Sequence, residues 1–230
     1  MRHDLNYENF LVARPLWAVF EEDRFGIPKM WETKLTKERA SFAEMLSFRH
    51  TRSMKDVANY IIEQFAFDFD LGSVWRNPFT GLKRLRSAAA VLGPDFSITP
   101  SMKEAQIIES TFKNRWMCCF YQEHSVDAIA TASWAEPWTY EICIQGMREG
   151  NPFAVSTIGV KDRKMFLDGF SYFARKLKPA YVICYGKPIE GMWGSIISFA
   201  YKEAWRPDKH AEQLKLFPVT RCQEISREGC

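Results

Sequence analysis

Short apolar runs alternate with longer amphipathic stretches over the C-terminal two thirds of the chain. The run "RSAAAVLGPDFSI" has the length of a buried strand, and after it Ala105, Ile108, Phe112 and Trp116 recur at helical spacing. A second amphipathic stretch, "KDRKMFLDGFSYFARKLKP", is apolar on one helical face, and Pro179 ends it before the run "AYVICYG". Apolar runs separated by helices are typical of a parallel sheet that is covered on both sides.

The same pattern indicates eight strands in the whole chain. Their expected ranges are 26–31, 44–49, 65–70, 88–95, 128–134, 153–158, 180–185 and 195–201. Besides the two long helices, we expect helical segments at 34–42, at 54–64, within "NPFTGLKRLRSA" and within "WTYEICIQGMREG", which Gly150 closes. The first third of the chain shows the weakest periodicity.

Eight strand and helix steps favour a compact (βα)8-like barrel with short helices, since such barrels begin near about 200 residues. An open doubly wound parallel sheet explains the same pattern if one or two N-terminal strands are misassigned. Residues 1–206 are expected to form a single α/β domain. Residues 207–230 lose the periodicity and are expected to form a mobile or docking tail.

Composition narrows the class of protein. The chain is 47% apolar and 15% aromatic, which is enough for a sizeable core. A formal charge of +3 from 31 basic and 28 acidic residues gives no global positive field for nucleic acid. The N-terminus lacks a secretion signal, and no apolar run approaches the roughly 20 residues of a membrane span. We therefore expect a soluble cytoplasmic protein.

The cysteines follow no metal-binding spacing, because neither a CxxC pair nor an accompanying histidine motif is present. Four of the six lie inside apolar helix or strand patterns, and we expect them to be buried free thiols: Cys118, Cys119, Cys143 and Cys184. The other two lie in the polar tail.

Polar residues gather where the apolar runs end. In either architecture, ligands bind at the carboxyl ends of the parallel strands, where the loops are free to vary. These ends would bring together Asp68, Asp95, Ser97, Ser133, Trp134, Ser156, Tyr185 and Lys187. The convergence predicts a strand-end pocket for a small polar ligand such as a nucleotide, a nucleoside or a sugar-like compound.

Two carboxylates carry the candidate chemistry. Asp68 and Asp95 can share a proton, bind a divalent cation through oxygen ligands, or act as acid and nucleophile on a glycosidic bond. If the protein is an enzyme, they are its catalytic candidates, while Ser156 and Lys187 would orient the ligand. The chain contains no P-loop, dinucleotide-binding, HExxH or GxSxG motif, so the sequence selects neither a cofactor nor a metal.

Structural roles compete with each of these assignments. Asp95 and Ser97 are also suitable N-caps for the helix that follows them, and Asp68 is suited to a solvated turn. Trp134 fits core packing as well as stacking on a ligand. Lys187 fits the exit turn of its strand.

Two further functions are open. A nucleic-acid-binding accessory protein would place a phosphate backbone on Arg76, Lys83, Arg84 and Arg86. Alternatively, a non-catalytic interaction protein would dock through its aromatic surface and its C-terminal tail.

Four motifs resemble a known family. The segment that begins "GPDFSITPSMKEAQIIESTFKNRWMCCFYQ", followed by "IATASWAEPWTYEICIQGM", "PFAVSTIGV" and "YVICYGKP", is similar in order and spacing to domain-of-unknown-function family 4417. That family is carried by phages, plasmids and bacterial genomes. Two acidic positions of the family pattern are replaced here, by Phe67 and within Pro100-Ser101-Met102. The resemblance implies phage or mobile-element context and no particular activity.

Overall fold

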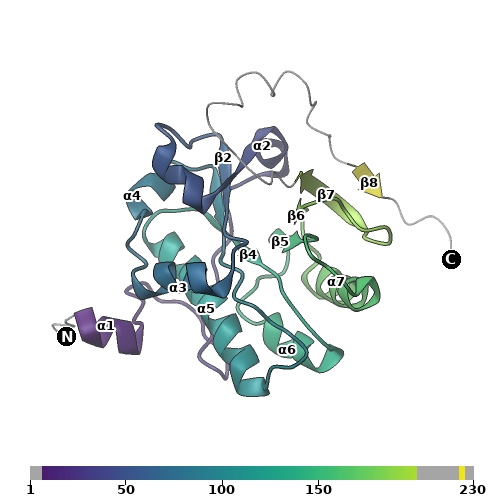
Figure 1. Ribbon diagram of the computed structural model, residues 1–230, viewed down its shortest axis with the longest axis horizontal. Helices are drawn as coiled ribbons and strands as arrows, with labels where there is room; N and C mark the ends of the chain where they lie inside the picture. Colours follow the sequence, from purple (N-terminus) through teal and green to yellow (C-terminus); the bar gives the residue numbers. More distant parts are fainter. Residues whose placement is uncertain (1–6, 201–222, 226–230) are drawn as a thin grey trace.

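The computed structural model describes residues 7–200 and 223–225 (Figure 1). Its centre is one sheet in which each strand pairs with the next along the chain. The pairs from β1 to β7 are parallel, and β8 pairs antiparallel with β7. The strands are β1 (Glu44–Ser47), β2 (Tyr60–Glu63), β3 (Ala90–Leu92), β4 (Ala128–Thr131), β5 (Phe153–Ser156), β6 (Val182–Tyr185), β7 (Gly194–Phe199) and β8 (Gln223–Ile225).

Helices occupy most of the connections between the parallel strands. The longest are α5 between β3 and β4 and α7 between β5 and β6. The helices are α1 (Tyr7–Ala13), α2 (Lys37–Phe42), α3 (Asp68–Arg76), α4 (Leu82–Leu85), α5 (Glu104–Glu123), α6 (Tyr140–Cys143) and α7 (Arg163–Leu177), with 3-10 turns η1 (Phe48–Ser53) and η2 (Pro137–Thr139).

The sheet curls into a half-barrel. Figure 1 shows α3, α4, α5, α6 and α7 outside the curve and α2 in its opening, between β2 and β7. Within the described residues β1 pairs only with β2, so closure of the expected (βα)8-like barrel is not confirmed. The doubly wound alternative is wrong, because the strand order runs in one direction from β1 to β8 without a reversal.

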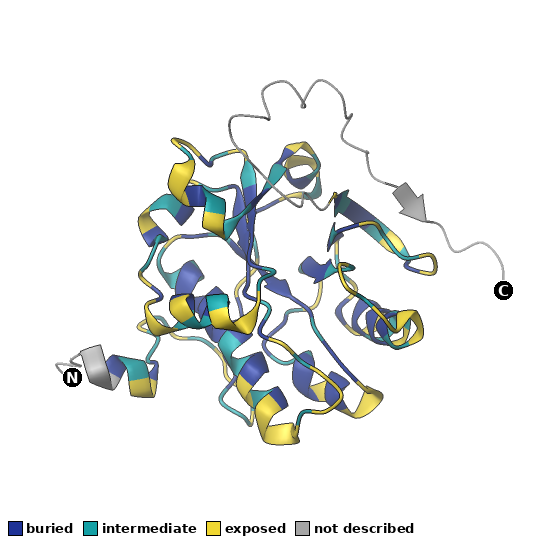
Figure 2. Ribbon diagram, viewed as in Figure 1, coloured by how far each residue is buried: buried dark blue, intermediate teal, exposed yellow. Residues whose placement is uncertain are grey.

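Successive residues of each strand face opposite sides of the sheet, and each side has its own core. Ile62 on β2 joins the larger cluster, which includes the inner faces of α5 and α7. Its neighbour Ile61 joins a smaller cluster with Leu35 and Ala40, from α2 and the segment before it. Figure 2 shows buried residues on the strands and on the sheet-facing sides of the helices. The smaller cluster also includes Leu92 at the end of β3 and Phe199 at the end of β7, so apolar side chains line this face along the length of its strands.

Two glycines allow helices to approach the rest of the core closely. A Cβ atom on Gly93, just after β3, would overlap the sulfur of Cys118 on α5. A Cβ atom on Gly169 of α7 would overlap the indole of Trp134. Close helix packing at these points leaves no space for a larger residue.

Two expectations for neighbouring segments are wrong. A strand, Tyr60–Glu63, lies where we expect a helix at 54–64. In place of the strand expected at 65–70, residues 65–67 belong to no helix or strand and α3 begins at Asp68. Ile61 and Ile62 are β-branched and fully buried, which favours a strand. The alternating "FAFDFD" instead places Asp68 and Asp70 in the first turn of α3, where carboxylates interact well with the helix dipole.

The expected strand at 26–31 is also wrong. Gly26 has a φ of 70°, and the side chain of Asp23 accepts hydrogen bonds from the amides of Phe25 and Ile27, which makes a tight turn. The next residues join no strand of the sheet: Pro28 forms an isolated antiparallel bridge with Glu22, and the Met30 amide donates to the carbonyl of Gly146 at 2.9 Å. Ile27 and Met30 are buried outside any strand, and their burial explains why the segment has the apolar pattern of one.

The four cysteines assigned to apolar patterns are buried free thiols, as expected. Burial raises the pKa of Cys118 to about 12. Most of the expected tail at 207–230 lies outside the described residues, and β8 is its described part. Within residues 7–200 and 223–225, no helix has both the length and the apolar character that a membrane span requires.

Candidate functional site

The loop after β3 carries Asp95 and is fixed from two sides. The side chain of Asn114, on α5, accepts from the amide of Phe96 at 2.9 Å and donates to its carbonyl at 3.3 Å. The hydroxyl of Thr131, the last residue of β4, donates to the carbonyl of Gly93 at 2.6 Å. Both Asn114 and Thr131 are buried, so the backbone that bears Asp95 is held rigidly at the end of its strand.

Asp95 and Ser133 meet at this strand end, as the sequence predicts. The Ser133 hydroxyl, just after β4, donates to the Asp95 carboxylate. Burial raises the pKa of Asp95 to about 6; the Ser133 hydrogen bond opposes the increase, the charge of Asp68 adds to it, and Arg115 opposes it. A carboxyl group with this pKa exchanges its proton close to neutral pH.

Asp68 and Ser97 form the adjoining part of the site. The Asp68 carboxylate, on the first residue of α3, accepts from the Ser97 amide at 3.0 Å and from its hydroxyl at 2.9 Å. N-capping by Asp95 or Ser97 is excluded, since α5 begins only at Glu104. The contact joins the loops after β2 and β3, so two carboxylates lie at neighbouring strand ends.

Glu63 is a buried carboxylate that the sequence analysis missed. It ends β2 with 4% of its surface exposed, and it accepts from the amide of Phe65 at 2.7 Å. Burial raises its pKa, while hydrogen bonds from Ser47 and Phe65 and the charge of Arg49 oppose the increase. The signal in the sequence is an acidic residue at the end of an apolar run, as in "YIIEQF". Because we expect a helix at 54–64, this run is not recognised as a strand and Glu63 is not recognised as a strand end.

An aromatic pair spans the concave face above the smaller core. Phe65, just after β2, stacks on Tyr185 at the end of β6, with ring centroids 5.4 Å apart and an angle of 14° between the planes. Because β2 and β6 are separated by three strands, the contact crosses the half-barrel from side to side. Tyr185 therefore lies at the expected rim, in contact with an aromatic residue of the opposite side.

Ser156 and Lys187 occupy the far side of the rim. The Ser156 hydroxyl, at the end of β5, accepts from the amide of Ile158 at 3.2 Å. The exposed Lys187 follows β6, and its carbonyl accepts from the Thr157 hydroxyl at 2.9 Å. The structure thus places both residues at strand ends, two and three strands from Asp95.

Trp134 lies in the core. Its ring is buried against Phe166 and Phe173 of α7, with centroids 5.4 and 4.9 Å away. We leave it out of the candidate site. Phe67 and Phe69 offer aromatic surface instead, because they flank Asp68 in sequence with 81% and 89% of their surfaces exposed.

The four basic residues of the nucleic-acid alternative belong to the connection between β2 and β3. Arg76 ends α3, Lys83 and Arg84 are on α4, and Arg86 follows it. The Arg86 side chain donates to the carbonyl of His124 at 3.0 Å. This group belongs to the helical layer outside the sheet.

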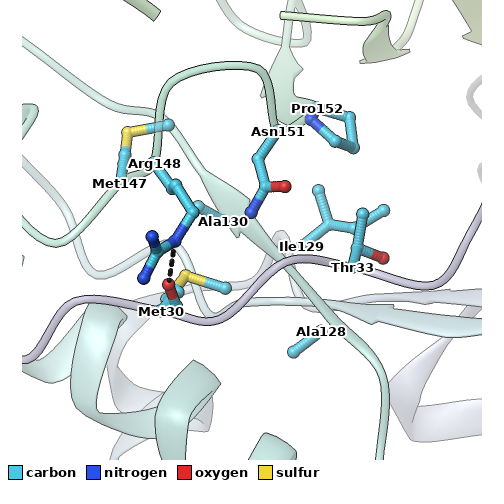
Figure 3. A pocket seen from close by; sticks show the side chains of 9 residues that line it. All are labelled: Met30, Thr33, Ala128, Ile129, Ala130, Met147, Arg148, Asn151 and Pro152. Carbon is cyan, nitrogen blue, oxygen red and sulfur yellow. Dashed lines mark hydrogen bonds between the residues drawn. The ribbon is translucent and has the colours of Figure 1, made fainter. Parts of the chain in front are cut away.

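One small cavity lies at the opposite end of the strands (Figure 3). It has a volume of about 10 Å³ and lies beside the start of β4 and the residues before β5, with Met30, Thr33 and Arg148 among its lining residues. That volume holds about one water molecule. Among residues 7–200 and 223–225, no three histidine, cysteine or acidic side chains are grouped to hold a metal ion.

Comparison with known proteins gives the family. Residues 20–202 match the family described as Domain of unknown function (DUF4417). The Gene 1 protein of Mycobacterium phage D29 is 29% identical over 143 residues, 60% of this chain and 53% of that protein. The Gene 1 protein of Mycobacterium phage L5 is 30% identical over 127 residues, 54% of this chain and 56% of that protein.

This chain spans about half the length of these two phage relatives. No solved structure matches it. The resemblance carried by the motifs around Asp95 and Ser133 is confirmed, because the family match includes every strand from β1 to β7. The chain belongs to the family described as Domain of unknown function (DUF4417).

Proposed function

We propose that the strand-end site around Asp95 and Asp68 binds a nucleotide, nucleoside or sugar-like ligand and cleaves it by acid–base catalysis. The observation that carries this proposal is the pKa of about 6 at Asp95, beside a second carboxylate. In such a pair of carboxyl groups, one group donates a proton and the other acts as the charged partner. The bond cleaved would be a glycosidic or phosphoryl bond with a leaving oxygen or nitrogen.

The proposed chemistry is a hydrolysis. Protonated Asp95 donates its proton to the leaving atom as the bond breaks, and Ser133 keeps the carboxyl group oriented. Asp68, on the exposed rim, accepts a proton from the water molecule that attacks the other fragment. Return of that proton to Asp95 restores the starting state.

The aromatic residues support a ligand with a flat ring or a sugar face. Phe67 and Phe69 flank Asp68 and are almost fully exposed, so a base or a sugar ring can stack on them. Ser156, Tyr185 and Lys187 are the ligand-orienting residues of this proposal, on the opposite part of the rim. In this proposal the bond to be cleaved lies between these two groups of residues.

A thermal-shift panel tests the proposal. Nucleotides, nucleosides and sugars are added to the purified chain, and a ligand at a hundred times its Kd should contribute about 2.7 kcal/mol of stability. This corresponds to a rise in Tm of roughly 5–10 °C for a domain of this size. Asp95→Asn and Asp68→Asn should each lose this rise, measured against their own ligand-free Tm.

Asp56→Asn is the matched control. Asp56 accepts from the amide of Ala58 in the turn before β2, at the other end of the strands, and asparagine can make the same turn. This variant should keep the full rise in Tm. If a ligand raises the Tm of the parent and raises that of Asp95→Asn by the same amount, its binding site lies elsewhere and the proposal is contradicted.

A second candidate function is binding of single-stranded nucleic acid, which one observation favours. The His124 carbonyl accepts from Arg86, and the His124 ring lies 5.5 Å from the exposed Trp17 and 5.7 Å from the exposed Phe79. Cations next to exposed aromatic rings provide both phosphate contacts and stacking surfaces. The four basic residues Arg76, Lys83, Arg84 and Arg86 would supply the phosphate contacts.

Salt dependence distinguishes this candidate. Anisotropy of a labelled single strand should show binding that weakens with salt, and Lys83→Gln with Arg86→Gln should lower the slope of log K against log salt by roughly 1.4. The double variant Lys34→Gln with Arg39→Gln is the control, because it removes two positive charges at exposed positions near α2. It should leave the slope of log K against log salt unchanged. Equal slopes for the parent and both double variants would exclude this surface.

A further inference from the structure

A hollow on the outer surface, between α6 and α7, lies outside the site described above. Its volume is about 480 Å³, and its lining residues are Tyr140, Asp168, Ser171, Tyr172, Arg175 and Lys176. The two helices are in contact and lie side by side in Figure 1. All but one of the lining side chains come from α7, and the exception, Tyr140, begins α6.

Tyr140 contributes a buried hydroxyl group with an unused hydrogen bond. The residue is 5% exposed, and its hydroxyl oxygen has no hydrogen-bond partner in the described part of the chain. The ring packs on that of Tyr172, with centroids 5.0 Å apart. Burial raises the pKa of Tyr140, and the charge of Asp168 adds to this, so the hydroxyl stays protonated and can donate.

In the described part of the chain, both carboxylates near the hollow have cationic partners. Lys164 pairs with Asp168 at 2.7 Å, and Lys176 lies 3.7 Å from Glu141, which also accepts from the Tyr172 hydroxyl. Both carboxylates are thus compensated.

Arg175 is exposed, and no ion-pair partner is found for it among residues 7–200 and 223–225. Ser171 accepts from Trp193 Nε1 at 3.4 Å, which leaves its own proton free to donate. The unused groups of the hollow are therefore donors: the guanidinium of Arg175 and the hydroxyls of Tyr140 and Ser171.

We propose that this hollow binds the phosphate or carboxylate group of an anionic ligand, through Arg175 and the Tyr140 hydroxyl. A guanidinium group binds either a phosphate or a carboxylate through two parallel hydrogen bonds. The buried Tyr140 hydroxyl gains an acceptor, which no residue of the described part of the chain supplies.

The test is an NMR titration of the full chain, labelled with ¹⁵N, with inorganic phosphate and with acetate in parallel at constant ionic strength. Saturable shifts are expected at the amides of Tyr140 and of residues 171–176. Arg175→Gln should weaken binding about tenfold or more, because a charge-assisted pair is lost. Comparison of the two anions shows whether the site selects phosphate or carboxylate.

Arg163→Gln is the control, because Arg163 is exposed on α7 but does not line the hollow. The affinity of this variant for phosphate and for acetate should match that of the parent protein. Shifts that do not saturate, or that survive in Arg175→Gln, would overturn the proposal.

Tyr140→Phe separates binding from structure. Because it removes a buried hydroxyl without a partner, the variant should keep or raise the Tm without phosphate while binding phosphate about threefold or more weakly. A lower Tm together with unchanged phosphate affinity would show that the hydroxyl is needed within the fold, and would also overturn the proposal.

Discussion

Arg115→Leu is expected to lower the free energy of unfolding by about 3–5 kcal/mol. The fully buried Arg115 side chain donates to three carbonyls, those of Gln145 at 2.9 Å, Thr131 at 2.9 Å and Cys143 at 2.8 Å. Each buried acceptor left without a donor costs about 1–3 kcal/mol. Urea denaturation followed by circular dichroism measures the loss.

Two other variants calibrate this result. Arg115→Lys keeps the charge but cannot reach all three carbonyls with one ammonium group, so its stability should fall between those of the parent and Arg115→Leu. Arg163→Leu, at an exposed position, should change stability by no more than about 0.5 kcal/mol. A loss below about 1 kcal/mol for Arg115→Leu would mean that other donors satisfy these carbonyls.

Asp95→Asn is expected to make the folded protein more stable at pH 7.5. In the folded state the Asp95 pKa is raised from 3.8 to about 6, so the native protein holds this proton more tightly than the unfolded chain. The stability that the protonated form contributes is fully present below about pH 4 and is lost as the pH rises through 6. At about 1.4 kcal/mol per pKa unit, the advantage of Asp95→Asn should reach about 3 kcal/mol at pH 7.5 and disappear below pH 4.

The same urea experiment across pH 3.5 to 8 measures this difference. Asp56→Asn again serves as the control, and its stability should run parallel to that of the parent because Asp56 is exposed in a turn. Lower stability of Asp95→Asn at pH 7.5 would show that the site favours the charged carboxylate, contrary to the proposed proton donor.

The later strands could be predicted from the sequence for a clear physical reason. The runs that became β3 to β6 are apolar, short and separated by helices, so their parallel arrangement and the meeting of Asp95 with Ser133 followed from the pattern. The early strands could not be placed so well. In "FAFDFD" the alternation of a strand competes with the helix-dipole preference of two aspartates, and the helix prevails.

The supporting residues of the site were out of reach of pattern analysis. Arg115 lies in an apolar helical stretch, and nothing in its sequence neighbours shows that three carbonyls from other segments converge on it. Asn114 likewise holds the Phe96 backbone from eighteen positions away. Such long-range polar contacts depend on how the helix lies against the sheet, which periodicity does not specify.

The most direct test of the account is the pKa of Asp95, measured by a ¹³C NMR titration of the side-chain carboxyl carbons, with Asp95→Asn to assign the signal. We expect a midpoint of about 6, and a lower midpoint in Asp68→Asn, where the neighbouring charge is removed. A midpoint near 4 that Asp68→Asn leaves unchanged would contradict it, because Asp95 would then be an ordinary ionised carboxylate with no proton to donate near neutral pH.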